Sequence, residues 1–208
     1  MLLIILTAVL LLAGLSAPLT DCDTLTQQVQ IQSREQFFGT WTFGAESSDI
    51  KGTHDLGKIF VRKLWGRVYP SNQSDHFYAF QVFRMTDTYC YSITSKLTLV
   101  NNTVHMEHPL SATEVLLKTS CPDCILFLSN TTIGEHTYRF LQILTKRPSL
   151  TSDELEEFKQ QAACLNFNEP IILGPPRSCP DSPDTKIVDF NMAFIQSTPR
   201  FKEIFYLI

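Results

Sequence analysis

The sequence predicts an all-β domain of eight short antiparallel strands, followed by one α-helix. Between Phe38 and Leu144 the chain consists of short apolar or alternating segments that are separated by turn-rich stretches. Segment 76–84, HFYAFQVFR, shows their bias towards aromatic and β-branched residues. After Pro148 the hydrophobic period lengthens to that of a helix. Eight strands at this spacing form a sandwich or a barrel, and the pattern leaves both open.

The expected strands have lengths that are usual in globular domains. In chain order they are 38–45, 58–65, 76–84, 90–99, 103–107, 113–119, 124–129 and 137–144. A further short strand is expected at 170–173, because Gly174 and the two prolines that follow it end the segment.

The helix has two start signals. Thr151 and Glu154 have the spacing of a capping box, and Leu150 with Leu155 forms a hydrophobic staple. An apolar face continues from Leu155 at helical spacing, which predicts that the helix packs against a sheet. The helix is expected to end at 164–166, before Pro170.

The first residues predict export from the cell. Met1 to Leu12 is almost purely apolar and is followed by small side chains, as in a secretory signal peptide. We expect cleavage after Ser16, because cleavage after Ala17 would leave Pro18 at the new N-terminus. The predicted parts are a signal peptide at 1–16, a domain at 17–180 and a C-terminal tail at 181–208. The mature protein is therefore expected to be secreted and extracellular.

Composition and charge narrow the class of protein. With 44% hydrophobic and 18% charged residues, the chain left after cleavage is typical of one globular domain. A net charge of −4 without a basic run argues against binding to nucleic acid or to anionic membranes. Six cysteines in an exported chain predict a disulfide framework with fifteen possible pairings. Three sequons agree with export and predict glycosylation at Asn72, Asn101 and Asn130.

Cys121 and Cys124 have a spacing that occurs in redox, zinc and structural sites. A redox pair normally opens a helix, whereas here an apolar strand follows, and a zinc ribbon would need a second pair. Pro122 and Asp123 suit the middle of a β-turn, whose ends lie within ~7 Å, close enough for a disulfide. We predict a structural Cys121–Cys124 bond in the sixth hairpin.

An immunoglobulin-type domain is the alternative fold. Cys22, Trp41 and Cys90 imitate its Cys–Trp–Cys spacing, but Tyr89 lies one residue before the second cysteine, where the tyrosine corner needs two. That fold also gives no reason for a capped helix after the eighth strand.

Motifs for catalysis or metal binding are missing from the sequence. His105 and His108 would face opposite sides of a strand, and no nucleophile elbow, zinc-protease motif or phosphate-binding loop is present. We expect no catalytic residue, no metal ion and no cofactor.

The segment FGTW at 38–41 places Gly-x-Trp at the start of the first strand, soon after a signal peptide. Together with seven further strands and a helix, it resembles the lipocalin signature. The segments TSDELEEFKQQAACLNF, TSCPDCILFLSN, YRFLQIL and TKRP, with the later Cys179, are similar to the alpha-1-acid glycoprotein and apolipoprotein M branch, which includes fish saxitoxin- and tetrodotoxin-binding lipocalins. The resemblance spans residues 22 to 180.

The resemblance implies an eight-stranded antiparallel up-and-down barrel with the C-terminal helix packed on it. Gly39 and Trp41 belong to the signature, and Arg147 or Lys146 would lie across the face of Trp41 at the closed end. The disulfides carried over from the family are Cys22–Cys164 and Cys90–Cys179, which leave Cys121–Cys124. The sequons at Asn72 and Asn101 would fall at closed-end turns, and the sequon at Asn130 at the open end.

The implied function is the carriage of a small hydrophobic ligand, with each buried methylene contributing ~0.8 kcal/mol. Alternation does not reveal which strand face is inside. The candidate lining residues are Phe60, Tyr78, Phe80, Val82, Tyr91, Ile93, Leu97, Phe127 and Leu141.

Arg139 matches an arginine with which apolipoprotein M binds a lipid phosphate. The other matching positions hold Ile93 and Ser95 instead of Arg and Trp, which argues against a sphingosine-1-phosphate-like ligand. A steroid, a neutral lipid, a basic drug-like molecule and an alkaloid toxin stay open.

We expect a monomeric carrier that is not an enzyme. Lipoprotein particles and a cell-surface receptor are the further partners to consider. Two functions compete with carriage: a lipocalin-type isomerase that acts through a free cavity cysteine, and an immunoglobulin-type protein-binding domain.

Overall fold

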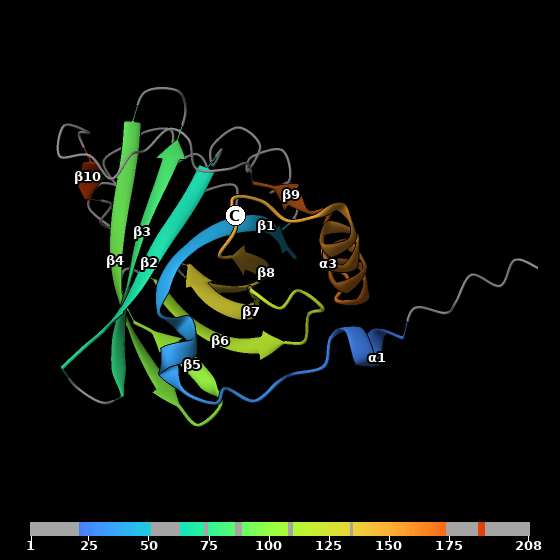
Figure 1. The fold of residues 1–208 in the computed structure, drawn as a ribbon, viewed down its shortest axis with the longest axis horizontal. Helices are drawn as coiled ribbons and strands as arrows, with labels where there is room; N and C mark the ends of the chain where they lie inside the picture. Colours follow the sequence, from blue (N-terminus) through green and yellow to red (C-terminus); the bar gives the residue numbers. More distant parts are fainter. Residues whose placement is uncertain are drawn as a thin grey trace, which may run out of the picture.

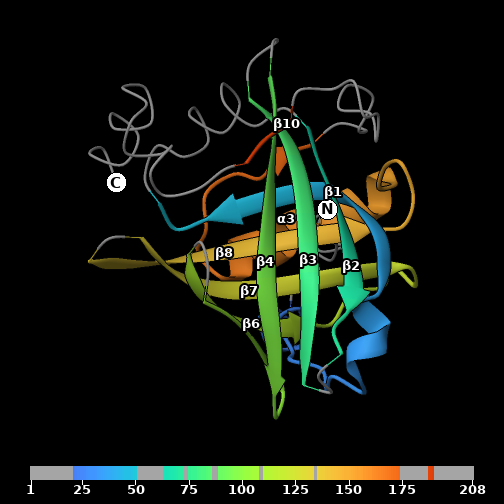
Figure 2. The ribbon, with the colours of Figure 1, turned by 90° about the vertical axis from the view of Figure 1, so that its left-hand side faces the viewer.

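The computed structural model describes residues 21–50, 63–72, 75–85, 89–107, 110–133, 135–173 and 187–189. Its main feature is a closed antiparallel barrel, in which strands pair in chain order and the eighth strand pairs with the first. Figure 2 shows β2, β3 and β4 crossing in front of β1, β7 and β8. The strands are β1 Gly39–Ser48, β2 Lys63–Pro70, β3 His76–Met85, β4 Tyr89–Val100, β5 Thr103–Met106, β6 Ser111–Leu117, β7 Cys124–Ile133 and β8 His136–Thr145.

This architecture confirms the predicted all-β barrel and excludes the immunoglobulin-type sandwich. The largest difference from the predicted strands is β2, which was expected at 58–65 and continues to Pro70. Gly66, which directly follows the last predicted residue of this strand, lies inside β2. A Cβ atom at Gly66 would lie 3.1 Å from the Phe80 carbonyl oxygen, so glycine here permits a close approach of two strands.

Helix α3, Ser152–Cys164, begins with the predicted capping box between Thr151 and Glu154. It lies outside the barrel, beside β1 (Figure 1). Phe158 and Ala162 are buried against outward side chains of the barrel, including Leu126, Leu141 and Ile143. Burial of an apolar helix face on a sheet is what the helical period predicted.

The N-terminal segment is tied to the helix and to the closed end of the barrel. The short helix α1, Cys22–Leu25, is joined to α3 by the Cys22–Cys164 disulfide. Gln161 of α3 donates hydrogen bonds to the carbonyl oxygens of Leu25 and Lys118, at 2.9 and 2.8 Å. The 3₁₀-helix η1, Arg34–Phe37, then leads into β1.

Two short strands follow the helix. β9, Ile171–Ile172, pairs with β1 at the expected place. β10, Ile187–Asp189, comes from the segment assigned to the tail and lies parallel to residues 90–92 of β4 (Figures 1 and 2). Among the described residues, no helix has the length and apolar character needed to cross a membrane.

Candidate functional site

The barrel interior is identified by an internal cavity at its closed end. The cavity holds about 30 Å³ and its lining is entirely apolar: Phe37, Trp41, Val68, Phe77, Leu97, Val104, Ile125, Phe127 and Leu144. Because successive side chains of a strand alternate between faces, these residues mark which positions of each strand point inward. We call this set the floor of the barrel.

The floor is closed from below by η1. The ring of Phe37 stacks on Phe77 and on Phe127, with ring centroids 5.5 and 5.8 Å apart. The Trp41 indole Nε1 donates a hydrogen bond of 2.6 Å to the Phe37 carbonyl oxygen. A cavity of this size holds about one water molecule, so a ligand has to lie nearer to the open end.

Polar side chains occupy inward positions just above the floor. Ser95 is two residues from Leu97 on β4, and Glu114 lies directly opposite Val104 across the β5–β6 pair. Ser129 lies opposite Glu114 in turn. These positions form a polar layer between the apolar floor and the open end.

A β-bulge brings a fourth polar side chain into this layer. Simple alternation from Trp41 would point Ala45 inward, but the register of β1 shifts between Phe43 and Ala45. Ala45 is consequently buried outside the barrel, beside Phe158 of the helix. Glu46 takes the inward position and pairs with Gln142 of β8.

The two glutamates differ in their hydrogen bonds. Gln142 Nε2 donates a hydrogen bond to Glu46 Oε2. Burial raises the pKa of the Glu46 carboxyl, and this hydrogen bond partly opposes the shift. Burial alone raises the pKa of Glu114 to about 7. Both side chains are only half-buried by accessible surface although protein surrounds them, as expected for groups that line an internal space.

The structure divides the predicted lining residues between the two faces. Leu97 and Phe127 line the floor, and Ile93 is half-buried at an inward position. Tyr78, Phe80 and Val82 lie on the outward face of β3, where Phe80 and Val82 pack with Trp65. Leu141 is also outward, under the helix. These four do not line the interior, because period-two alternation fits either face equally well.

Two further predicted lining residues have side chains outside the described part of the structure. Phe60 lies outside the described residues, and so does the side chain of Tyr91, whose backbone belongs to β4. The polar layer, in contrast, is absent from the set of site residues expected from the sequence. Its signal was available at 112, 114 and 116, where a glutamate interrupts an alternating apolar row.

Arg139 does not point into the barrel. Its Nε atom donates a hydrogen bond of 2.9 Å to Asp49 Oδ2, and its backbone N–H donates one of the same length to Asp49 Oδ1. The guanidinium also lies 4.8 Å from the centroid of the Phe167 ring. Arg139 therefore lies on the outer wall with a carboxylate partner, which does not fit an anchor for an anionic ligand.

The cation over Trp41 is Lys146, whose Nζ lies 5.0 Å from the ring centroid. Arg147, the other cation predicted for this contact, instead forms ion pairs with Asp123 at 2.9 Å and with Glu154 at 2.7 Å. It thus joins the β6–β7 turn to the first turn of α3. The reason is alternation again, because adjacent residues at a strand end point to opposite sides.

The β6–β7 turn contains the Cys121–Cys124 disulfide, with Cα atoms 5.3 Å apart. The resemblance implied this pairing and Cys22–Cys164, and the structure contains both. Cys179, in the third implied pairing with Cys90, lies outside the described residues. Every cysteine whose side chain the structure describes is in a disulfide.

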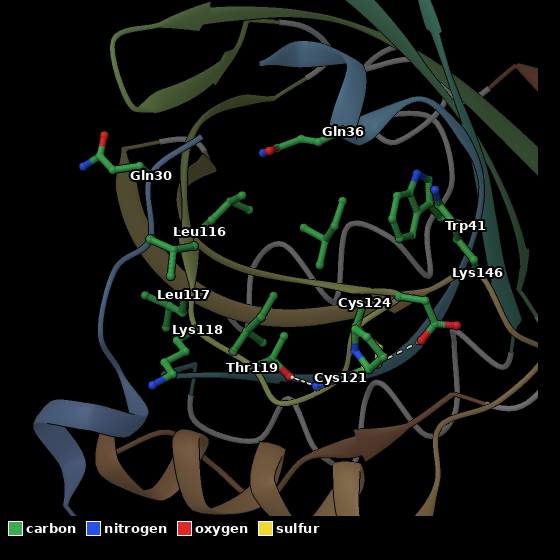
Figure 3. Close-up of a pocket in the computed structure, with 15 residues that line it drawn as sticks. Gln30, Gln36, Trp41, Leu116, Leu117, Lys118, Thr119, Cys121, Cys124 and Lys146 are labelled. Carbon is green, nitrogen blue, oxygen red and sulfur yellow. Dashed lines mark hydrogen bonds between the residues drawn. A yellow bond between two sulfur atoms is a disulfide. The ribbon is translucent and has the colours of Figure 1, made fainter. Parts of the chain in front are cut away.

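An outer groove of about 430 Å³ lies at the closed end, below the floor (Figure 3). The N-terminal segment, the β6–β7 hairpin and Trp41 line it. Trp41 and Ile125 line both the groove and the floor cavity, so their side chains lie between the two. Gln36 Nε2 is buried here without a hydrogen-bond partner.

The three sequon asparagines have exposed side chains. Asn72 follows β2, and Asn101 lies in the β4–β5 turn with φ of 54°, a conformation that asparagine tolerates well. Asn130 lies within β7. Exposure of these side chains is compatible with glycosylation.

No protein-family model matches the chain, and no curated protein matches it in sequence. Among solved structures, the chain is similar to the siderocalin Ex-FABP, which is described as functioning through dual ligand specificities. The two share 12% sequence identity with a TM-score of 0.60, and the match covers 71% of this chain and 95% of that chain. It is also similar to the bovine lipocalin allergen Bos d 2, with a TM-score of 0.56 and 17% identity over 70% and 97% of the two chains. At these identities the likeness concerns the fold. The chain thus has the closed eight-stranded barrel and packed helix of the lipocalins.

Proposed function

We propose that the protein is a secreted glycoprotein that carries a small, mainly apolar molecule inside its barrel. The observation that carries this proposal is the closed barrel with an apolar floor and half-buried apolar side chains above it. Ile93, Met106 and Phe140 occupy inward positions and keep accessible surface, although the strands around them are closed. Binding of an apolar ligand is favourable because it removes this apolar surface from contact with water.

The finer assignment is to the alpha-1-acid glycoprotein and apolipoprotein M branch. Support comes from the Cys22–Cys164 and Cys121–Cys124 bonds, which that resemblance implies. Disulfide mapping by peptide mass spectrometry tests the assignment. A Cys90–Cys179 peptide is expected, and any other partner for Cys90 would contradict the branch.

Native mass spectrometry of the protein secreted by cultured cells, after enzymatic removal of glycans, tests carriage. The expected result is a folded monomer with additional mass that is lost on denaturation and identifies the ligand. Retention of the protein inside the cell would contradict the secreted role. A tightly associated protein partner in place of a small molecule would favour receptor or lipoprotein binding as the main function.

Isomerase activity is the second candidate function, and it requires a free cysteine thiol in the barrel. A thiol titration of the unfolded, unreduced protein separates the two. Carriage without catalysis predicts no free thiol, whereas two free thiols per chain, those of Cys90 and Cys179, would reopen the enzymatic role.

A further inference from the structure

The disulfide of the β6–β7 turn has a cation beside its sulfur atoms. Arg147 Nη2 donates a hydrogen bond to Cys121 Sγ at 3.1 Å and a longer one to Cys124 Sγ at 3.9 Å. Ion pairs with Asp123 and Glu154 hold the guanidinium in this place. In cysteine pairs that exchange with thiols, a helix N-terminus or a nearby cation stabilises the thiolate. Here an arginine occupies the position of that stabilising group.

The same surroundings suit the reduced form of the pair. Asp123 Oδ1 lies 3.2 Å from Cys121 Sγ, where a carboxylate oxygen can accept a hydrogen bond from a thiol. The reduced sulfur would donate to Asp123 and accept from Arg147. Opening of the bond costs the fold little, because the two cysteines have a sequence separation of 3 and a short loop gains little chain entropy. The bond can therefore open and close in the folded protein.

The outer groove at the closed end gives access to this bond. Both cysteines line the groove, and Figure 3 shows them at its edge. Cys124 is half-buried, whereas Cys121 is only 4% exposed. Cys124 Sγ is therefore the sulfur open to attack, and Cys121, which contacts Arg147, is the sulfur that leaves.

The charge of the groove selects among thiols. Its lining contains two exposed lysines, Lys118 and Lys146, and neither forms an ion pair within the described part of the chain. In the view of Figure 3 the two cysteines lie between these lysines. Asp123, the carboxylate of the lining, is paired with Arg147. The groove therefore favours a molecule with a negative charge.

We propose that the Cys121–Cys124 bond is a thiol–disulfide exchange site for small thiols that carry a carboxylate. A thiolate attacks Cys124 Sγ, and the electron pair of the S–S bond moves to Cys121 Sγ, where Arg147 stabilises the negative charge until water supplies a proton. A second thiolate attacks the substrate sulfur of the mixed disulfide and releases Cys124, which is protonated in turn. Two thiols are thus oxidised to one disulfide, and the protons they lose to water are balanced by those that the two cysteines take up. This activity lies outside the barrel and does not depend on the carrier function.

The second described disulfide is a control within the same chain. Cys22 is exposed and Cys164 is half-buried, so by the exposure of its residues this bond is the more accessible of the two. Among the described residues, no lysine or arginine donates a hydrogen bond to its sulfur atoms. Accessibility alone would make Cys22–Cys164 react first, whereas an exchange site at Cys121–Cys124 predicts the opposite order.

Three small thiols test the site: 3-mercaptopropionate, 2-mercaptoethanol and cysteamine, which are anionic, neutral and cationic. The folded full-length secreted protein is treated with each thiol and quenched with an alkylating reagent, and peptide mass spectrometry locates the labelled cysteines. Each rate constant is divided by that of the same thiol with bis(2-hydroxyethyl) disulfide, which removes differences in ionisation and nucleophilicity. We expect Cys121–Cys124 to open before Cys22–Cys164 and fastest with 3-mercaptopropionate, while the protein stays folded.

Variants separate the contribution of the groove from that of the arginine. Joint replacement of Lys118 and Lys146 by glutamine should remove the preference for 3-mercaptopropionate over cysteamine and leave the rate with 2-mercaptoethanol unchanged. Lys159→Gln removes an exposed lysine of α3 that does not line the groove, and should change no rate. Arg147→Gln should slow opening by all three thiols about tenfold, the loss expected for one hydrogen bond to a charged group. Arg147→Lys should restore part of that loss.

Three results would each overturn the exchange site. They are opening of Cys22–Cys164 as fast as Cys121–Cys124 in the folded protein, equal normalised rates for the three thiols, and an unchanged rate in folded Arg147→Gln. If Arg147→Gln does not fold, the lysine variants still decide, because they leave the sulfur atoms and their partners untouched. The presence or absence of a ligand in the barrel affects none of these rates, so the carrier function is tested separately.

Discussion

Replacement of Glu114 by glutamine should stabilise the folded chain at neutral pH and leave its stability unchanged at pH 4. Glutamine has nearly the same shape as glutamate and carries no charge. The carboxyl group of Glu114 is surrounded by protein and has no partner in the described residues. Desolvation is therefore the effect that makes its pKa differ between the folded and the unfolded chain. The variant therefore isolates the free energy of burying this one charge.

The sign follows from proton binding in the two states. The pKa of Glu114 is about 7 in the folded chain, against an ordinary value of 4.5. Below pH 4.5 the group is protonated in both states. Between the two values only the unfolded chain releases the proton, so the free energy of unfolding falls as the pH rises, and above about pH 7 the loss is complete.

The magnitude is set by the distance between the two pKa values. One pH unit of separation corresponds to about 1.4 kcal/mol, so full ionisation of the wild-type carboxyl costs about 3 kcal/mol of stability. Glu114→Gln removes this cost. Above pH 7 its free energy of unfolding should exceed that of the wild-type protein by about that amount, as an upper value, since water in the interior also solvates the group.

Urea unfolding of both proteins between pH 4 and pH 8, followed by tryptophan fluorescence, measures this difference. Subtraction of the two curves removes the contributions of all other titrating groups. Glu135→Gln, in which an exposed carboxyl is replaced, should show no dependence of the difference on pH. If the free energies of unfolding of Glu114→Gln and the wild-type protein differ by the same amount at pH 4 and pH 8, the assignment of Glu114 to a desolvated interior position is refuted.

Three further predictions concern the frame of the barrel. Replacement of Cys22 and Cys164 by alanine should lower the free energy of unfolding by about 5 kcal/mol, because their bond closes a loop with a sequence separation of 142. Loss of the disulfide in the β6–β7 turn, with a separation of 3, should lower it by only about 2 kcal/mol. Chemical denaturation without reductant measures both values. Lys146→Met should cost about 0.5–1 kcal/mol and change the tryptophan emission, because it removes an exposed cation from the face of Trp41. Arg139→Gln should leave the ratio of affinities for 1-naphthoate and 1-naphthalenemethanol unchanged in calorimetry, since the arginine pairs with a carboxylate on the outer wall; selective loss of the anion would restore the arginine as an anchor.

Local chemistry accounts for what the sequence determined by itself. The strand segments follow from aromatic and β-branched composition, and the start of α3 follows from the capping box at Thr151. The Cys121–Cys124 bond follows from a two-residue turn that brings its ends together. Each of these features depends on residues within a few positions of one another.

The content of the interior was decided by the tertiary structure. Alternation assigns side chains to two faces but does not say which face the closure of the barrel makes the inside, so Tyr78, Phe80, Val82 and Leu141 were placed on the wrong one. The bulge after Phe43 moves Glu46 inward, and the pairing of β6 with β5 and β7 places Glu114 on the inner face of the barrel as well. The acidic interior thus arises from long-range strand register, which depends on packing between segments far apart in the chain.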